Sequence, residues 1–163
     1  MEKIISLNFL ISNILISKHN KVVLVTGCFD IFHSGHKAFL KAAKKQGDVL
    51  IVGLELDKRV RKLKGKDRPI NSWKKRVKEL AALSAVDFVF PLPEKFDSPK
   101  DHLKLLQLIR PKILAVSENT PNLEKKRKLI EKIGGKLFVY PFNPKYSTTK
   151  SLRQKTGSFL GRG

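Results

Sequence analysis

Two histidines separated by two residues are the most distinctive chemical feature of this sequence. His33 and His36 lie in the segment 27–36 (Gly-Cys-Phe-Asp-Ile-Phe-His-Ser-Gly-His), which directly follows a short apolar run. An imidazole donates a hydrogen bond to a phosphate oxygen whether it is neutral or protonated. Gly35 between them carries no side chain, so a bulky anion can approach the backbone. The segment therefore indicates a site that binds a phosphate group.

The elements on either side favour the same chemistry. Residues 22–25 are short and apolar, which is typical of a buried parallel strand. Residues 35–45 place apolar side chains on one helical face and lysines on the other. The start of such a helix offers unpaired N–H groups and partial positive charge to an anion. The alternative is that the two histidines lie at a helix start by chance and that one of them is only a cap.

Apolar runs alternate with amphipathic stretches along the rest of the chain. Further strands are predicted at residues 48–54, 86–90, 112–116 and 136–140. Helices are predicted at residues 57–63, 73–84, 100–109, 121–133 and 147–155. This alternation predicts an α/β domain with a parallel five-stranded sheet covered on both faces. Ligands of such sheets bind beyond the carboxyl ends of the strands, near the switch in strand order.

Three segments, in order, resemble the motifs of the cytidylyltransferase-like nucleotidyltransferases. The first is segment 27–36, which contains the family's His-x-Gly-His element. The second is residues 63–71 (Leu-Lys-Gly-Lys-Asp-Arg-Pro-Ile-Asn) with Arg76, which is similar to the adenylyltransferase domain of heptose-phosphate enzymes. The third is Ser-Thr-Thr at residues 147–149. The resemblance covers residues 21–155 and implies a Rossmann-like, three-layer α/β/α fold.

The resemblance also implies a reaction: transfer of a nucleotide monophosphate from ATP or CTP to a phosphorylated acceptor, with release of pyrophosphate. The second motif favours ATP and a sugar-phosphate acceptor of the heptose type. Residues 117–121 (Ser-Glu-Asn-Thr-Pro) depart from the Gly-x-Asp-type element that many relatives carry near the base, so the choice of base stays open. The alternatives are a cytidylyltransferase acting on glycerol phosphate or on choline or ethanolamine phosphate, an FAD-synthetase-like adenylyltransferase, and a non-catalytic RNA-binding module.

Matching the motifs residue by residue assigns roles. The resemblance implies that His33 and His36 contact the triphosphate, that Lys64 closes over the reacting phosphates, and that Arg76 binds phosphate as a bidentate donor. The predicted nucleotide-binding residues are Gly27, Cys28, Phe29, Gly35, Ser147 and Thr148. The predicted acceptor contacts are Asp30 and Lys66. Mg²⁺ is expected to bridge phosphate oxygens, with no metal ligand assigned to the protein.

Several of these residues have plainer alternatives. Lys64 and Lys66 are two among many lysines, and an exposed charge is the default for Arg76 in a predicted helix. Asp30 is also a candidate cap for the first helix. Cys28 has no neighbouring base in the sequence, so it is better interpreted as a small filler than as a reactive thiol.

Composition limits the remaining possibilities. The chain has 163 residues, which fits one domain, and its 34 Lys and Arg against 14 Asp and Glu give a net charge of +20. Such a charge predicts weak, nonspecific binding of polyanions as well as attraction of anionic substrates. One cysteine excludes an internal disulfide and a multi-cysteine metal site, and it favours a cytoplasmic location.

The ends of the chain lie outside the predicted domain, residues 21–155. Residues 4–16 are mostly apolar but interrupted by polar side chains, and a membrane span needs about 20 apolar residues. We therefore expect no membrane span, and we interpret residues 1–20 as an extension that packs as a strand or helix on the domain or on a second subunit. A homodimer is expected by resemblance. Residues 156–163 are predicted to be a flexible basic tail.

Overall fold

The first apolar run forms the central strand of a parallel sheet in the computed structural model, which describes residues 2–14 and 20–141. Strand β1 (Val22–Gly27) pairs with β2 (Val49–Leu54) on one side and with β4 (Ile113–Ser117) on the other. Strand β3 (Phe88–Pro91) lies beyond β2, and β5 (Lys136–Tyr140) lies beyond β4. The order β3-β2-β1-β4-β5 confirms the predicted parallel five-stranded sheet.

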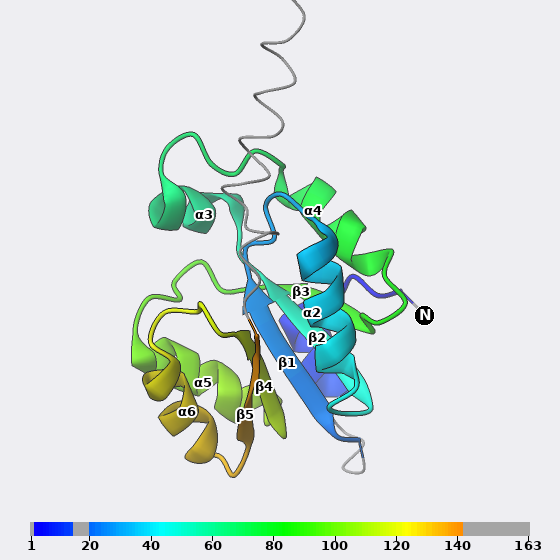
Figure 1. Cartoon of the computed structure of the whole chain (residues 1–163), viewed down its shortest axis with the longest axis vertical. Helices are drawn as coiled ribbons and strands as arrows, with labels where there is room; N and C mark the ends of the chain where they lie inside the picture. Colours follow the sequence, from blue (N-terminus) through cyan, green and yellow to red (C-terminus); the bar gives the residue numbers. More distant parts are fainter. Residues whose placement is uncertain (1, 15–19, 142–163) are drawn as a thin grey trace, which may run out of the picture.

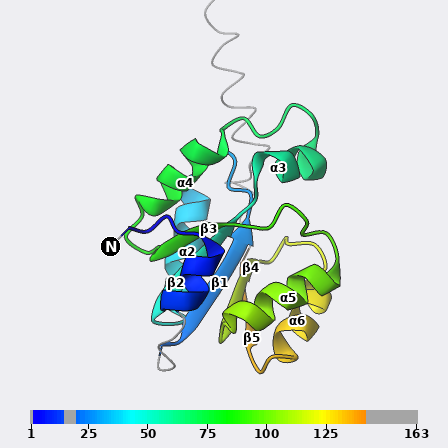
Figure 2. The same ribbon diagram turned by 180° about the vertical axis from the view of Figure 1, so that it is seen from behind.

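Helices cover both faces of this sheet (Figures 1 and 2). Helices α2 (Ser34–Lys44) and α4 (Trp73–Ala81) pack on one face, and α5 (Pro99–Ile109) and α6 (Leu123–Glu131) pack on the other. Helix α3 (Asp57–Lys64) lies beyond the carboxyl ends of the strands, above α5 and α6 in Figure 1. The Rossmann-like, three-layer α/β/α fold is therefore confirmed. The predicted helix 147–155 and the tail 156–163 lie outside the described residues.

The alternation of side chains along β1 builds two cores. Val23 and Val25 are buried with the α2 and α4 side chains, while Val22 and Leu24 are buried with those of α5 and α6. Successive residues of a strand point to opposite faces, so an uninterrupted apolar run fits a strand that is covered on both sides. This burial holds β1 in the middle of the molecule. The turn that follows β1 lies in the segment 27–36, where the sequence predicts a phosphate site.

The N-terminal extension packs on the same domain. The Ile5 N–H donates to the Val89 carbonyl at 3.0 Å, and the Val89 N–H donates to the Lys3 carbonyl at 2.8 Å, so the segment lies along the free edge of β3. A helical turn, α1 (Leu7–Phe9), then continues into a π-helical turn, η1 (Leu10–Ile14), whose first residue is fully buried. Of the two positions expected for this extension, the structure shows packing on the domain. No helix in the described ranges is both long and apolar enough to cross a bilayer.

The connection from β3 to β4 positions the site. Helix α5 carries the chain to the opposite face of the sheet, and β4 then lies beside β1 rather than beyond β3. The connection to β2 runs through α2 on one face of the sheet, and the connection to β4 runs through α5 on the other face. A crevice forms where such connections diverge, at the carboxyl ends of β1 and β4. The turn after β1 opens into it.

Candidate active site

The turn from β1 to α2 has an unusual backbone at Phe29. Its φ of +46° lies in the left-handed region, which bulky residues rarely adopt. The Phe29 ring meets the His36 ring edge-on with 5.2 Å between ring centroids, and a Cβ on Gly27 would lie 2.9 Å from the Phe29 ring. Gly27 therefore leaves room for Phe29, and Phe29 in turn packs against the second histidine. Backbone strain of this kind is found at functional turns.

His33 is the N-cap of helix α2. Its Nδ1 accepts hydrogen bonds from the N–H groups of Gly35 at 3.1 Å and of His36 at 3.4 Å. An accepting Nδ1 carries no proton, so in the neutral imidazole the proton is on Nε2, which becomes a donor. Burial lowers the pKa of His33 and keeps the ring neutral. Capping and phosphate binding are therefore compatible, because they use different nitrogens of the ring.

His36 is stacked on His33, with 3.8 Å between ring centroids and 18° between ring planes. Burial, assisted by the neighbouring His33 and by the charge of Lys64, lowers the pKa of His36 to about 3. Its Nδ1 is buried and has no hydrogen-bond partner among the described residues. The site thus presents two neutral imidazoles at a helix N-terminus, where they can act as hydrogen-bond donors without being charged.

Asp30 is buried and holds the loop before α4 in place. Its carboxylate accepts from the N–H groups of Ile70 at 3.0 Å and Asn71 at 2.9 Å and from Arg68 Nε at 2.5 Å. Burial opposes ionisation of Asp30, but these donors outweigh it and lower its pKa. The alternative that Asp30 caps α2 is wrong, because the cap is His33. Its predicted contact with the acceptor stays a prediction, and the bonds present give it a positioning role.

Arg76 is fully buried and ties three loops together. Its Nη1 donates to the carbonyls of Cys28 and Glu55, both at 2.8 Å. Its Nε donates to the Asn71 carbonyl at 3.0 Å, and its Nη2 donates to Asp57 Oδ1 at 2.6 Å. The sequence predicts a phosphate ligand here. That contact stays a prediction, and the hydrogen bonds present give Arg76 a positioning role in which it holds the turns after β1 and β2.

A cleft of about 590 Å³ opens beyond the carboxyl ends of β1 and β4. Gly27, Cys28 and Lys64 line it, and the charge of Lys64 acts on both Cys28 and His36. The structure thus brings Lys64 to the edge that carries the histidines. Lys66 is exposed and is not among the lining residues. Burial raises the pKa of the Cys28 thiol, which fits its interpretation as a filler.

Sequence reasoning missed a polar network on the α5–α6 side of this cleft. Arg59 is buried and donates from Nη2 to the Phe96 carbonyl at 3.0 Å, from Nε to Glu55 Oε2 at 3.4 Å, and from Nη1 to Asp97. The cleft is also lined by His102 and Lys126. The rule that ligands meet the carboxyl ends of parallel strands points to residues 55 and 94–97, which follow β2 and β3. Ser147 and Thr148 lie outside the described residues.

A comparison with protein families identifies the chain. The model of the cytidylyltransferase-like family matches residues 24–153, which include the histidine pair, the buried arginine and the cleft. The chain belongs to the cytidylyltransferase-like family. This membership makes it a nucleotidyltransferase.

Curated relatives in the family include proteins named Bifunctional protein HldE. The one from Coxiella burnetii is 41% identical over 130 residues, which are 79% of this chain and 26% of that protein. The one from Helicobacter pylori is 47% identical over 104 residues, which are 64% of this chain and 21% of that protein. This chain therefore spans about a quarter of the length of these relatives.

Among solved structures, the lipopolysaccharide core biosynthesis protein of Thermoplasma volcanium is similar over nearly its whole length. Its TM-score is 0.62 and its identity is 27%, and the match covers 76% of this chain and 97% of that one.

Proposed function

We propose that this chain transfers AMP from ATP to the phosphate group of a sugar phosphate and releases pyrophosphate. The observation that carries the proposal is the stacked pair of neutral histidines, His33 and His36, at the start of α2; they do not line the cleft themselves, but the charge of Lys64, which does, acts on His36. The second sequence motif, which resembles the adenylyltransferase domain of heptose-phosphate enzymes, supports ATP and the sugar. The similarity to HldE and to a lipopolysaccharide core biosynthesis protein supports the same acceptor class.

In the proposed reaction an oxygen of the acceptor phosphate attacks the α-phosphorus of ATP. A new P–O bond forms, the bond from the α-phosphorus to the bridging oxygen breaks, and pyrophosphate leaves with the electron pair. The attacking oxygen is already ionised, so no general base is needed. Catalysis then consists of positioning the two anions and stabilising charge in the transition state.

Different residues position the two anions and stabilise the charge of the transition state. His33 Nε2–H and the His36 ring donate to phosphate oxygens, the N–H groups at the start of α2 add partial positive charge, and Lys64 supplies a full charge at the edge of the cleft. Arg76 and Asp30 hold the loops around them. On resemblance, Ser147 and Thr148 complete the triphosphate site.

Mg²⁺ belongs to the proposal as a companion of the nucleotide. Within residues 2–14 and 20–141, no group of three or more His, Cys, Asp or Glu side chains is placed to hold a metal ion. We propose that phosphate oxygens of the nucleotide would hold the ion, with Lys64 and the histidines contacting the same phosphates. When bound there, Mg²⁺ neutralises phosphate charge.

The proposal is tested by measuring pyrophosphate release with ATP or CTP, each offered with hexose and heptose 1-phosphates, glycerol phosphate, choline phosphate and flavin mononucleotide. We expect release from ATP with a sugar 1-phosphate. Release only from CTP with glycerol phosphate or choline phosphate would replace the proposal with the cytidylyltransferase alternative. Release from no pair, by a folded protein, would overturn it.

Three further properties are part of the proposal and rest on the sequence. They are a homodimeric state, weak nonspecific binding of polyanions, and a cytoplasmic location, where ATP and sugar phosphates are found. The RNA-binding alternative is favoured only by the net charge of +20. Steeply salt-dependent RNA binding without any nucleotide binding would support that alternative.

A further inference from the structure

The α5–α6 side of the cleft holds a carboxyl and an ammonium group with unused hydrogen-bonding capacity. Glu55, directly after β2, is 9% exposed at its side chain, and Lys126 lies in α6. Both residues line the cleft, and their charges act on each other. Glu55 Oε2 accepts a hydrogen bond from Arg59 Nε. Within the described part of the chain, Glu55 Oε1 and Lys126 Nζ have no hydrogen-bond partner.

These two groups are set in a rigid frame. Arg59 is anchored to Asp97 and to the Phe96 carbonyl, so the Glu55 carboxyl that it contacts has a fixed position. The Glu55 side chain is 9% exposed and Lys126 is half-buried, so both groups have given up part of their hydration, and this burial raises the pKa of Glu55 and lowers that of Lys126. A partly buried acceptor and donor that line an open cleft gain most from a ligand that offers both a hydrogen-bond donor and a lone pair.

A polyhydroxylated body meets this requirement better than a nucleotide base. Each hydroxyl is both donor and acceptor, so two neighbouring hydroxyls can satisfy a carboxylate and an ammonium together. A base would need a flat aromatic or apolar face to stack on. The one phenyl ring among the lining residues, Phe96, is 2% exposed and already stacks on His102, with 4.0 Å between ring centroids, so a base would have only aliphatic side chains such as Leu63 and Pro121 to pack on.

We infer that Glu55 and Lys126 recognise hydroxyl groups of the acceptor. Glu55 Oε1 accepts from one sugar hydroxyl, and Lys126 Nζ donates to a neighbouring hydroxyl or ring oxygen. The acceptor phosphate then lies toward Lys64, which lines the same cleft. Arg59 is a positioning residue that fixes the Glu55 carboxyl. This inference rests on the proposed function, since it assumes a sugar-phosphate acceptor.

The test compares E55Q and K126M with K128M, a change of an exposed lysine on the same helix that does not line the cleft. Glutamine keeps the oxygen that accepts from Arg59, so E55Q preserves the frame. Steady-state KM values are measured for the sugar 1-phosphate that gives the highest wild-type activity and for ATP. We expect the acceptor KM to rise at least about tenfold in E55Q and K126M, with the ATP KM within about twofold of wild type and K128M unchanged.

The other outcomes decide against the inference in different ways. A rise in the ATP KM without a rise in the acceptor KM would show that the pair binds the nucleotide, through its ribose hydroxyls or its base, and would overturn the inference. Unchanged KM values in folded, active variants would remove both residues from substrate recognition. If the wild type released no pyrophosphate with any sugar phosphate, the proposed function would fail and this inference with it, whereas an active wild type with unaltered variants overturns the inference alone.

Discussion

At the scale of single residues, the chemistry depends on which nitrogen of each histidine carries a proton. The N-cap bonds leave His33 with its donor at Nε2, and burial against Phe29 and Phe32 keeps His36 uncharged. A neutral donor does not attract a phosphate as strongly as an imidazolium does, so the attraction must come from the helix start and from Lys64. Because the histidines donate hydrogen bonds in their neutral form, the proposed contacts to phosphate do not depend on protonating them over a wide pH range.

The low pKa of His36 predicts a pH dependence of stability. The unfolded chain takes up a proton near pH 6.5, whereas folded His36 does so only at about pH 3. Because the unfolded state binds more protons between these values, the free energy of unfolding falls as the pH drops below 6.5, by about 1.4 kcal/mol per pH unit for one group. We expect H36Q to show a shallower dependence than wild type in urea unfolding from pH 7.5 to 5.

The matched control for this experiment is K41Q, on the exposed face of the same helix. Lysine does not titrate in this range, so K41Q should follow the wild-type curve. The account of His36 would be contradicted if H36Q and wild type lost stability in parallel over the whole range.

The sequence predicted the position of the histidine pair but not the surroundings of Arg76 or Asp30. A run of glycine, aromatic and histidine residues after an apolar strand is a local signal, and it predicted the turn correctly. The partners of Arg76 come from loops 19 and 48 residues away, at Asp57 and Cys28, and no local pattern specifies them. A charged residue in a predicted helix gives the same signal whether it faces solvent or the core.

At the scale of elements, the loops that frame the cleft are held by few, buried contacts. Arg76 joins the ends of β1 and β2 to the loop before α4 through three carbonyls and one carboxylate. Removing the guanidinium leaves three carbonyls without their donor, and a buried acceptor left unsatisfied costs about 1–3 kcal/mol. We expect R76M to lose stability on this scale in urea unfolding and to lose activity even where it is still folded.

The comparison for R76M is R61A, which removes an exposed arginine from α3. Exposed substitutions usually change stability by less than about 0.5 kcal/mol. A loss of under about 1 kcal/mol in R76M would contradict the positioning role that the structure gives to Arg76.

The N-terminal extension supplies a second, independent prediction for an element. Leu10 is 0% exposed and lies in the core cluster with the α5 and α6 side chains, whereas its neighbour Phe9 is 46% exposed. Leucine-to-alanine changes in a core cost about 2–5 kcal/mol. We expect L10A to lower the free energy of unfolding on this scale and F9A to change it by less than about 1 kcal/mol. Equal effects of the two changes would show that the extension does not pack as described.

Element positions were predicted better than their ends. The β-branched runs and the amphipathic stretches predicted each strand and helix from residues 22 to 140, because both patterns reflect burial that the fold imposes. The predicted helix 73–84 ends earlier, as α4 (Trp73–Ala81), and the predicted helix 121–133 is α6 (Leu123–Glu131). The apolar residues 4–16 indicated packing, but nothing in their spacing specified the pairing of residues 3–5 with the edge of β3 or the π-helical turn that follows.

At the scale of the whole molecule, the parallel sheet brings sites from distant segments to one edge. The turn after β1, the loops after β2 and β3, and helix α6 after β4 all meet at the carboxyl ends of the strands. The sequence predicted this edge from fold class alone, but it did not predict the cleft, since the cleft's network of Glu55, Arg59 and Asp97 forms only when these loops come together.

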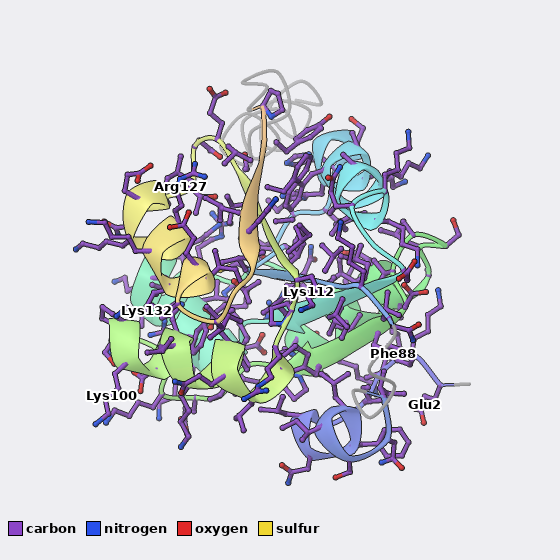
Figure 3. The ribbon with its side chains drawn as sticks, turned by 90° about the horizontal axis from the view of Figure 1, so that it is seen from below. Glu2, Phe88, Lys100, Lys112, Arg127 and Lys132 are labelled. Carbon is purple, nitrogen blue, oxygen red and sulfur yellow. The ribbon has the colours of Figure 1, made fainter. Side chains whose placement is uncertain are left out.

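The net positive charge of the molecule comes from basic side chains, several of which point outward from the α5 and α6 side. Figure 3 shows the labelled side chains of Lys100, Arg127 and Lys132 pointing away from the ribbon on the α5 and α6 side. A net charge of +20 raises the local concentration of anionic substrates and draws them toward the protein, an effect that weakens as salt increases. Binding to polyanions and dimerisation stay predictions.

The most direct measurement of the central claim is the turnover number of H33A and H36A in the pyrophosphate assay, with ATP and a sugar 1-phosphate. The control is K41A, on the exposed face of α2. The loss of one donor to a developing negative charge lowers turnover about 10²–10³-fold. We predict a fall of at least about 10²-fold in each histidine variant, with folding retained and K41A near wild type. Turnover within a few-fold of wild type in folded H33A and H36A would contradict the account.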